Sequence, residues 1–414
     1  MRAPSYSRRD DEVFSAETIE NPQPLYARLR REHPISRIAE TGVHLVATRD
    51  LIEEALEREA DFSANLTGVL LRGEDGRPSV LELPSSPASR VIATADEPAH
   101  AVHRSVVQPR LAPSRIAALE SALRRWAHAA IDAWIETGAG DFVPIAERVP
   151  ARVLAELLGL PDGDVSRHRT WAMMGGDILA GDLDRERWAH LARETAAMRE
   201  YLLAHLEKAR ADTRPEVDAP LLHSLARGVH SRDIEVEEAV GIATVMFGAG
   251  GESTAALLGS VVRRLSEEDE LVDRLRDDLA LVPAFVEEVA RLEPPFNFHY
   301  RVVRRPCALG GADLQPGDRL MLLWASANRD ETRIEAPDEL RLDRRHPRDH
   351  LAFGRGAHFC IGANLARLEA RVVCEDLLAR DQRLVPSPDA KPEYARSIFV
   401  RRLERLPLIV GRTP

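Results

Sequence analysis

The most constraining feature of the sequence is a ten-residue stretch, residues 353–362, that combines three glycines with a single cysteine. Gly354 and Gly356 allow a tight turn and a close approach of the backbone to a flat, bulky partner. A helix-like run begins directly after Gly362, so we expect Cys360 at the N-terminal end of a helix. The free N–H groups there favour a thiolate over a thiol. A thiolate in a glycine-rich loop is an axial ligand that a haem iron can use.

Cys360 also admits other interpretations. A lone cysteine is most often a small buried hydrophobic residue, and this interpretation stays open on the residues alone. A zinc site is disfavoured because Cys307 and Cys374 are distant in sequence and form no C-x-x-C pair, while His358 would supply only one further ligand. A phosphate-binding loop is disfavoured because no Gly-Lys-Ser or Gly-Lys-Thr follows the glycines.

The stretch resembles the haem-thiolate signature of the cytochrome P450 family, Phe-Gly-x-Gly-x-His/Arg-x-Cys-x-Gly, with every fixed position filled. The resemblance implies a mainly α (α+β) fold, helix-rich with small β-sheets, in which residues 1–414 form a single domain. It implies haem b as the cofactor and Cys360 as the axial ligand of its iron. Residues 350–372 would form the haem-thiolate loop and the following helix. The other signature positions implied to contact the cofactor are Phe353, Gly354, His358 and Gly362.

The composition of the whole chain agrees with a large soluble fold. Of the 414 residues, 44% are hydrophobic, which is enough for a sizeable core, and the net charge of −11 argues against general nucleic-acid binding. Three cysteines fit a reducing cytoplasm without disulfides. Residues 1–20 read as an N-terminal extension that begins with a charged segment lacking an apolar core, so we expect neither a signal peptide nor a membrane anchor. The expected location is the cytoplasm.

Most of the remaining sequence has the periodicity of amphipathic helix. A short hairpin is expected over residues 35–47, and strands are expected over 313–324. The helices expected from periodicity lie at 21–33, 49–58, 115–136, 150–158, 184–211 and 281–292.

Two segments lack a regular pattern and read as covers over a binding site. Residues 62–96 are rich in Ser, Pro and Gly, and their apolar content favours a substrate lid without regular structure over a disordered loop. The resemblance places this lid over the distal face of the haem. Residues 171–183 are apolar and interrupted by glycines, and they resemble the helix-loop-helix that roofs the pocket in the family.

Residues 234–264 form the longest helical pattern, although three of the four residues 248–251 are glycines. Each glycine costs a helix roughly 1 kcal/mol relative to alanine. The glycines therefore make a local widening for a ligand, or they let another backbone pack closely. The segment resembles the central distal helix of the family, in which Ala249 and Gly250 would lie over the haem.

The same helix carries the candidate catalytic residues. By resemblance, Glu252 and Ser253 are the acid–alcohol pair that handles protons, and Thr254 follows them. The usual residue at the alcohol position is threonine, so Ser253 keeps the hydroxyl and loses the methyl group. This departure leaves proton relay intact and loosens the oxygen pocket.

Charged side chains elsewhere form candidate anchors for the cofactor. His100 and Arg104 are four residues apart, so they share one face of a helix and can clamp a carboxylate, or they form an ordinary solvated face. The resemblance implies that both, together with Arg301 and His358, bind the haem propionates.

Glu288 and Arg291 are three residues apart and form a weak motif on the residues alone. The resemblance makes them a buried structural pair whose third member is an arginine before the cysteine loop. Glu339 stands where that arginine is expected. Either Arg341 or Arg344 is the expected replacement, and the sequence does not choose between them.

No flavin or nicotinamide motif accompanies the haem signature, so we expect electrons from a ferredoxin and its ferredoxin reductase. Arg355, Arg367 and Arg371 surround the cysteine and would form either a basic docking face or ordinary surface charge.

The expected function is the O2-dependent oxidation of a small apolar or aromatic molecule in secondary metabolism. A second hypothesis is oxidative C–C or C–N coupling of aromatic substrates without oxygen insertion, which Ser253 and several aromatic residues would suit. A haem-binding or sensing protein without turnover and a peroxide-driven enzyme are further alternatives. The residues expected to line the substrate pocket are Phe247, Phe296, Phe298 and Phe399.

Overall fold

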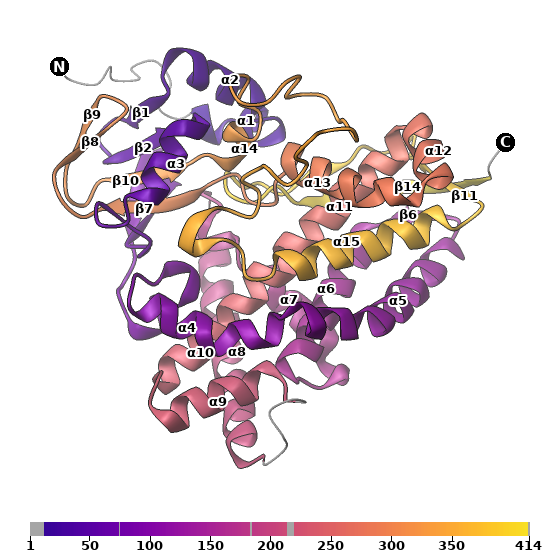
Figure 1. Ribbon diagram of the computed structural model, residues 1–414, viewed down its shortest axis with the longest axis horizontal. Coiled ribbons are helices and arrows are strands. Elements are labelled where there is room, and N and C mark those ends of the chain that lie inside the picture. Colours follow the sequence, from indigo (N-terminus) through magenta and orange to yellow (C-terminus); the bar gives the residue numbers. More distant parts are fainter. Residues whose placement is uncertain (1–11, 74, 183, 213–218, 413–414) are drawn as a thin grey trace.

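The computed structural model describes residues 12–73, 75–182, 184–212 and 219–412. Helices fill one side of the molecule, and most strands gather at the end near the N-terminus (Figure 1). The helices are α1 (Ala16–Glu20), α2 (Gln23–Glu32), α3 (Arg49–Glu57), α4 (Ala99–Val107), α5 (Pro113–Ile135), α6 (Val143–Leu158), α7 (Val165–Ala172), α8 (Arg185–Ala211), α9 (Leu221–Ser231), α10 (Val236–Phe247), α11 (Ser253–Glu267), α12 (Asp269–Asp277), α13 (Val282–Leu292), α14 (Trp324–Ala327) and α15 (Ala363–Leu378).

The helices expected from periodicity correspond to α2, α3, α5, α6, α8 and α13. The expected start of α6 at Pro150 is wrong, because the helix begins at Val143 and continues through the proline. Pro150 removes one backbone hydrogen bond, yet apolar residues on both sides of it are buried in the core. Packing of this apolar face outweighs the local cost.

The main sheet has five strands in the order β1-β2-β10-β7-β3. The expected hairpin is β1 paired with β2, and β10 joins β2 in parallel and β7 in antiparallel orientation. The strands of this sheet are β1 (Ile35–Ile38), β2 (Val43–Val46), β3 (Phe62–Ser63), β7 (His299–Val303) and β10 (Arg319–Leu322). The smaller sheets contain β4 (Gly68–Arg72) with β5 (Pro78–Glu82), β8 (Cys307–Leu309) with β9 (Ala312–Leu314), β12 (Glu393–Tyr394) with β13 (Leu403–Arg405), and β11 (Gln382–Pro386) with β14 (Pro407–Arg412) and β6 (Ala139–Asp141).

The long central helix crosses the core. Helices α10 and α11 run almost end to end, and α11 packs against α6, α13 and α15. Figure 1 shows α15 lying alongside α5 and α11, with the cysteine loop at its start. The span 236–267 is long and apolar enough to cross a membrane, but 72% of its apolar window is buried inside the fold. It is the core helix of the protein.

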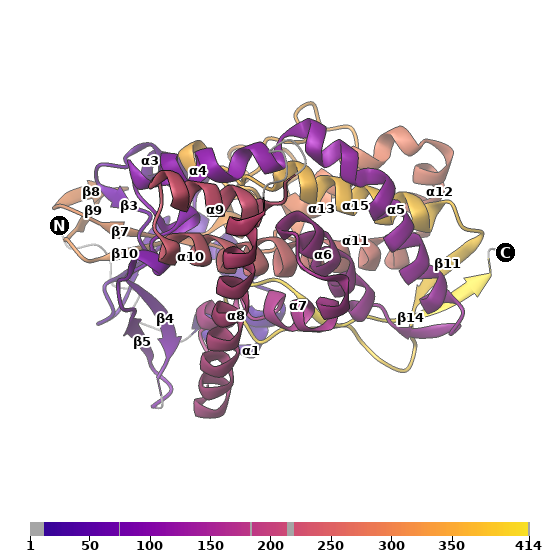
Figure 2. The same cartoon turned by 90° about the horizontal axis from the view of Figure 1, so that it is seen from below.

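The region 62–96 differs from the expected lid without regular structure, because it contains the hairpin β4–β5 and two short 3-10 turns. In the hairpin, Val69 pairs with Leu81, and Gly76 takes a positive φ of 80° in the connecting turn. The missed signal is the pair of apolar runs on either side of a glycine-containing turn. The hairpin projects from the sheet end in the same direction as α8 (Figure 2), and the Arg72 N–H donates to the Gly181 carbonyl oxygen at 2.7 Å.

Candidate active site

The loop that carries Cys360 folds back on itself before α15. Gly354 and Gly356 have φ angles of 68° and 73°, in the left-handed region that glycine adopts without strain. The Cys360 N–H donates to the Phe353 carbonyl oxygen at 2.8 Å and closes the loop. The guanidinium of Arg367, on α15, lies 4.4 Å from the centre of the Phe353 ring and holds the loop against the helix.

The Cys360 sulfur lies close to backbone donors at the start of α15. Burial raises the pKa of the thiol above its ordinary value, and the opposing effects of the Gly362 N–H, the charges of Arg367 and Arg104 and the Ala363 N–H reduce this rise without cancelling it. The cysteine remains solvent-accessible, so its sulfur can meet a ligand. Within the described ranges, no group of three or more His, Cys, Asp or Glu side chains could hold a metal ion.

Two imidazoles lie together beside the cysteine loop. The ring centres of His100, on α4, and His358 are 4.1 Å apart. Nδ1 of His100 lies 2.8 Å from a Glu97 carboxylate oxygen. Nε2 of His100 and Nδ1 of His358 are buried, and neither atom has a hydrogen-bond partner in the part of the chain that the structure describes. Buried ring nitrogens without partners carry a desolvation cost that a bound acidic group would remove.

Two arginines bring positive charge to the same place. Arg301, on β7, is 8% exposed, and it donates to the Tyr300 carbonyl oxygen at 2.8 Å. Burial lowers its pKa to about 10, so it stays charged at neutral pH. Arg104 donates to the Phe359 carbonyl oxygen at 2.9 Å, inside the cysteine loop. Burial and the neighbouring Arg301 lower the pKa of His358 to about 3, so its ring is neutral.

Arg301 and His358 line a cavity of about 210 Å³ next to the cysteine loop. All four predicted propionate anchors therefore lie around one place, although they come from α4, β7 and the loop before α15. Asp96 and Glu97 also line this cavity, but the two arginines and the ring nitrogens that lack partners among the described residues form a donor set that suits carboxylates. The chemistry of this cluster fits the acidic edge of a haem.

The central helix widens into a π-helical turn at Gly248–Glu252, between α10 and α11. The predicted local widening is therefore confirmed. Ala249 is exposed and Ser253 is partly exposed on this turn. The Ser253 hydroxyl donates to the Ala249 carbonyl oxygen four residues earlier. This bond satisfies a backbone group that the π turn frees from the regular helical pattern.

The glycines of this turn also serve close packing, so both interpretations of them hold at different positions. A Cβ atom on Gly248 would lie 2.7 Å from Cα of Gly175, and one on Gly251 would lie 2.4 Å from Cβ of Ala172. A Cβ atom on Gly250 would lie 2.9 Å from a Leu154 methyl group. Gly250 is thus directed toward α6, in contrast to the exposed Ala249.

Glu252 is fully buried, and its carboxylate is held by groups from distant segments. It accepts the Gly176 N–H at 2.6 Å and lies 3.3 Å from Nε of Arg402. Burial raises its pKa to about 7, although Arg402 acts in the opposite direction. Thr254, the next hydroxyl after Ser253, is buried at 3% exposure.

Three of the four aromatic pocket candidates lie in the core, and their place in a substrate pocket stays a prediction. Phe247 is completely buried and lies edge-on to Trp171. Phe298 and Phe399 are 1% and 3% exposed and pack against each other with ring centres 5.4 Å apart. Phe296 is only half-buried, and its ring stacks on Phe399 at 4.5 Å. Aromatic residues beside a ligand site and aromatic residues in the core produce the same sequence pattern, and only packing separates them.

Glu288 and Arg291 form the expected buried pair, joined by hydrogen bonds of 2.7 and 2.9 Å. Arg344 is the third member, because its Nε donates to a Glu288 carboxylate oxygen at 2.8 Å. Arg341 reaches the same oxygen through its backbone N–H at 3.0 Å. Glu339 contributes its carbonyl oxygen, which accepts from Arg291 at 2.9 Å.

The three arginines near the cysteine do not form a free basic face. Arg355 pairs with Glu53 at 2.8 Å, and Arg371 pairs with Glu120 at 2.8 Å. Arg367 donates to Glu287 at 2.6 Å and its side chain is only 14% exposed. Each charge already has a carboxylate partner, so the pairing favours ordinary surface charge over a basic docking face, the two alternatives that the sequence left open.

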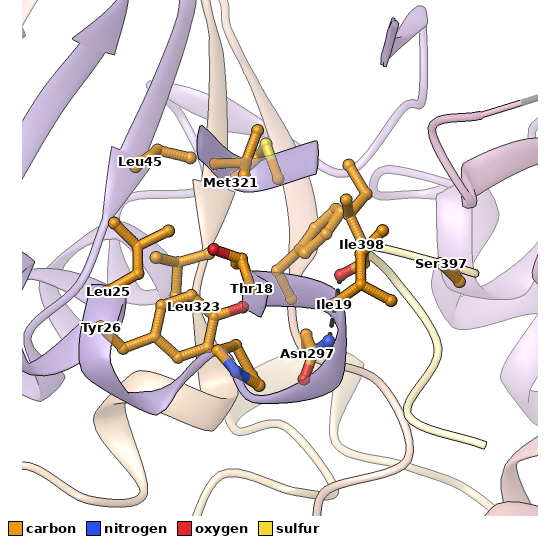
Figure 3. Close-up of a pocket in the computed structure, with 13 residues that line it drawn as sticks. Thr18, Ile19, Leu25, Tyr26, Leu45, Asn297, Met321, Leu323, Ser397 and Ile398 are labelled. Carbon is orange, nitrogen blue, oxygen red and sulfur yellow. Dashed lines mark hydrogen bonds between the residues drawn. The ribbon is translucent and has the colours of Figure 1, made fainter. Parts of the chain in front are cut away.

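A separate small pocket lies between α1, α2 and the main sheet (Figure 3). Its lining includes Tyr26, Leu323 and Asn297, and Asn297 donates to the Ile398 carbonyl oxygen at 3.0 Å. The volume of about 20 Å³ is close to that of a single water site. This pocket is too small for an organic substrate.

A family model described as Cytochrome P450 matches residues 183–405. The chain belongs to the cytochrome P450 family. It is 40% identical over 404 residues to cytochrome P450 144 of Mycobacterium tuberculosis, with 96% of this chain and 91% of that protein covered. It is 32% identical over 378 residues to the erythromycin C-12 hydroxylase of Saccharopolyspora erythraea, with 90% of each chain covered. The structure of CYP109E1 from Bacillus megaterium in complex with testosterone matches with a TM-score of 0.82 and 26% identity, over 97% of this chain and 99% of that one.

Membership of the P450 family confirms the predicted resemblance, the helix-rich fold and the haem cofactor. It also confirms that the protein is an oxidoreductase of the monooxygenase type. The sequence prediction missed Glu97, Glu147 and Arg402, all of which contact predicted site residues or their partners. Glu97 precedes His100 by three residues, which is a local signal. Glu147 and Arg402 had no such signal, because Arg402 meets Glu252, and Glu147 meets Arg402, only in the folded chain.

Proposed function

We propose that this P450 inserts one oxygen atom of O2 into a bulky apolar molecule, in the cytoplasm and as part of secondary metabolism. The chain is 32% identical to an erythromycin C-12 hydroxylase and 28% identical to a steroid C26-monooxygenase of Mycobacterium tuberculosis. One name describes the hydroxylation of erythromycin and the other the monooxygenation of a steroid. The half-buried apolar residues Leu66, Leu83 and Leu179 of the two cover segments, together with Phe296 before β7, are proposed to contact the substrate.

The observation that carries the proposal is the convergence of the Cys360 loop with the buried charge of Arg301 and with imidazole nitrogens that lack a hydrogen-bond partner among the described residues. The bound haem supplies the redox chemistry and the activation of dioxygen. In the proposed arrangement, Cys360 binds the iron as a thiolate, and backbone N–H groups at the start of α15 stabilise its charge. His100, Arg104, Arg301 and His358 orient the propionates by charge-assisted hydrogen bonds.

The π turn supplies the proton-handling groups. Glu252 is proposed to hold a proton at its buried carboxyl group, and Ser253 is proposed to pass it on through its hydroxyl. The hydroxyl now donates to the Ala249 carbonyl oxygen, so a rotation about one side-chain bond is enough to redirect it.

Electrons are proposed to come from a ferredoxin and its reductase. A groove of about 300 Å³ beside the cysteine loop is lined by Ile116, Val286 and Leu368, and by arginines that already pair with carboxylates. Its apolar lining supports a carrier that docks mainly by shape and apolar contact. No observation favours oxidative coupling, since Phe247, Phe298 and Phe399 belong to the core.

The test begins with the visible spectrum of the haem-loaded protein, reduced with dithionite and treated with carbon monoxide. A strongly red-shifted Soret band is expected for the native chain, and its loss is expected for Cys360→His with the fold retained. Macrolides and steroids are then titrated for a spin-state change, and bound compounds are turned over under 18O2 with a ferredoxin system. Incorporation of one labelled oxygen supports hydroxylation, whereas coupled products without label would contradict it.

A further inference from the structure

The carboxylate of Glu252 is turned away from its predicted partner, Ser253. One of its oxygens accepts the Gly176 N–H, and the other lies 3.3 Å from Nε of Arg402. The Ser253 hydroxyl donates instead to the Ala249 carbonyl oxygen. The position of the buried acid is therefore set by the segment after α7 and by the start of β13, outside the central helix.

Arg402 is shared between several carboxylates. Its Nη1 lies 3.5 Å from Glu147 of α6, and its Nη2 lies 4.0 Å from the exposed Glu404. Glu147 in turn meets Arg169 of α7 at 3.5 Å. Two guanidinium groups thus serve three carboxylates, which leaves one excess negative charge when every group is ionised. Glu404 and Arg169 are exposed, and the buried part of the cluster, Glu252, Glu147 and Arg402, likewise has one more carboxylate than guanidinium, which favours the uptake of one proton.

Two further carboxylates face this cluster, and one of them, Asp177, is itself paired with the exposed Arg187. Asp177, after α7, raises the pKa of Glu252, and Asp141, on β6, raises the pKa of Glu147. Burial is the largest cause of the raised pKa at both glutamates, and Arg402 lowers the pKa of each. The two acids therefore depend on the same cation.

We propose that Arg402 is a positioning residue for Glu252, and that Glu147 competes for the same guanidinium and thereby sets the pH at which Glu252 takes up a proton. The inference rests on the proposed role of Glu252 as the acid beside Ser253. An acid that is half protonated near the working pH can both release and regain a proton in each cycle. The competition between Glu147 and Glu252 for Arg402 brings the protonation midpoint of Glu252 close to the working pH.

The test uses two variants that change the charge balance in opposite directions. Arg402→Leu removes the cation, so the protonation midpoint of Glu252 is expected to rise by about one to three pH units. Glu147→Gln removes the competitor and leaves Arg402 to Glu252, so the midpoint is expected to fall. Arg402→Lys keeps a positive charge and is expected to restore a midpoint near the native value. A matched control is Arg405→Leu, which removes an exposed arginine paired with the exposed Glu393 and is expected to change nothing.

The midpoint is measured by infrared difference spectroscopy of the carboxyl band in the resting, haem-loaded protein during a pH titration. The band is assigned by its absence in Glu252→Gln. The pH dependence of kcat and the share of reducing equivalents lost to peroxide are measured in parallel, and the kinetic midpoint is expected to move with the infrared midpoint. Retention of the carbon monoxide spectrum confirms that each variant is folded.

Opposite shifts in Arg402→Leu and Glu147→Gln support the proposal. Unchanged midpoints, or shifts in one common direction, would overturn it. If Arg402→Leu does not fold, the downward shift in Glu147→Gln and the native midpoint of Arg402→Lys decide the question. Failure of the proposed function would appear separately, as an absence of hydroxylated product from the native enzyme, because the infrared titration requires no turnover.

Discussion

At the scale of single residues, burial decides which charged groups pair. Glu288 is completely buried and needs several donors, so it takes the side chains of Arg291 and Arg344 and the backbone N–H of Arg341. The side chain of Arg341 points instead to Asp343, and both are outside the core. Two arginines three positions apart therefore have different roles, although the sequence presents them as alternatives.

Arg344→Met is expected to destabilise the fold by about 1.5–3 kcal/mol, because it removes a charged hydrogen-bond donor from a buried carboxylate. Arg341→Met keeps the backbone N–H that donates to Glu288, so its free energy of unfolding is expected to stay within about 0.5 kcal/mol of the native value. Urea unfolding of both variants under identical conditions provides the measurement. Equal losses in the two variants would contradict the assignment of Arg344 as the third member.

Glu252 predicts a pH dependence of stability with a definite sign. Its pKa is about 7 in the folded state against an ordinary value of 4.5, so the folded state binds the extra proton and stability falls as pH rises from 4.5 to 7. The side chain of Glu252→Gln cannot ionise. The fall in the free energy of unfolding over this pH range is therefore expected to be about 3 kcal/mol smaller in the variant. Thermal unfolding between pH 5 and 8 should give a flatter profile for the variant, and parallel profiles would contradict the shifted pKa.

At the scale of elements, the π turn depends on how closely the segment after α7 approaches it. Gly175 and Gly248 touch backbone to backbone, since a Cβ atom on Gly175 would lie 2.3 Å from Cα of Gly248. The Gly176 N–H bond to Glu252 lies directly beside this contact. The segment after α7 therefore has two roles: Gly175 packs against the π turn, and Gly176 holds the carboxylate of Glu252.

Gly175→Ala is expected to push the roof segment away from the central helix at a cost of about 1–3 kcal/mol, because backbone atoms cannot yield as a flexible side chain can. The matched control is Gly163→Ala, where a Cβ atom meets nothing within 4 Å and φ is not positive. Thermal unfolding and the affinity for a spin-shifting substrate are the measurements. A Gly175→Ala variant as stable as the control would show that the contact is not tight in solution.

At the scale of the whole molecule, Glu287 links α13 to the cysteine loop. It accepts from Arg367 at 2.6 Å and lies 3.0 Å from Nε2 of His350, and Arg367 also covers Phe353. Although burial opposes the charge, the bonds from His350 and Arg367 lower the pKa of Glu287 to about 2. The carboxylate therefore contributes stability that is present above pH 4.5 and is lost as pH falls toward 2.

Glu287→Gln is expected to lower the free energy of unfolding by about 3 kcal/mol at pH 7. The variant is also expected to release haem at a higher pH during acidification, because Glu287 no longer holds Arg367 and His350 beside the cysteine loop. Loss of the Soret band during an acid titration measures the release. Glu270→Gln, at an exposed position on α12, is the control and is expected to follow the native curve. Coincident curves for both variants would contradict the bracing role of Glu287.

The sequence by itself determined the features that depend on local chemistry. The glycine spacing around Cys360, the broken pattern of the central helix and the i, i+3 spacing of Glu288 and Arg291 each specify a conformation within a few residues, and the structure contains all three. The family follows from the same short-range signals and is confirmed by the comparisons.

Only the tertiary structure decided the features that need segments far apart in the chain. Arg402 meets Glu252 across 150 positions, Arg344 reaches Glu288 across 56, and the apparent docking arginines find carboxylates on other elements. The aromatic candidates divided between fully buried and half-buried positions for the same reason. Burial and ion pairing depend on what folds against a residue, and neither periodicity nor spacing along the chain carries that information.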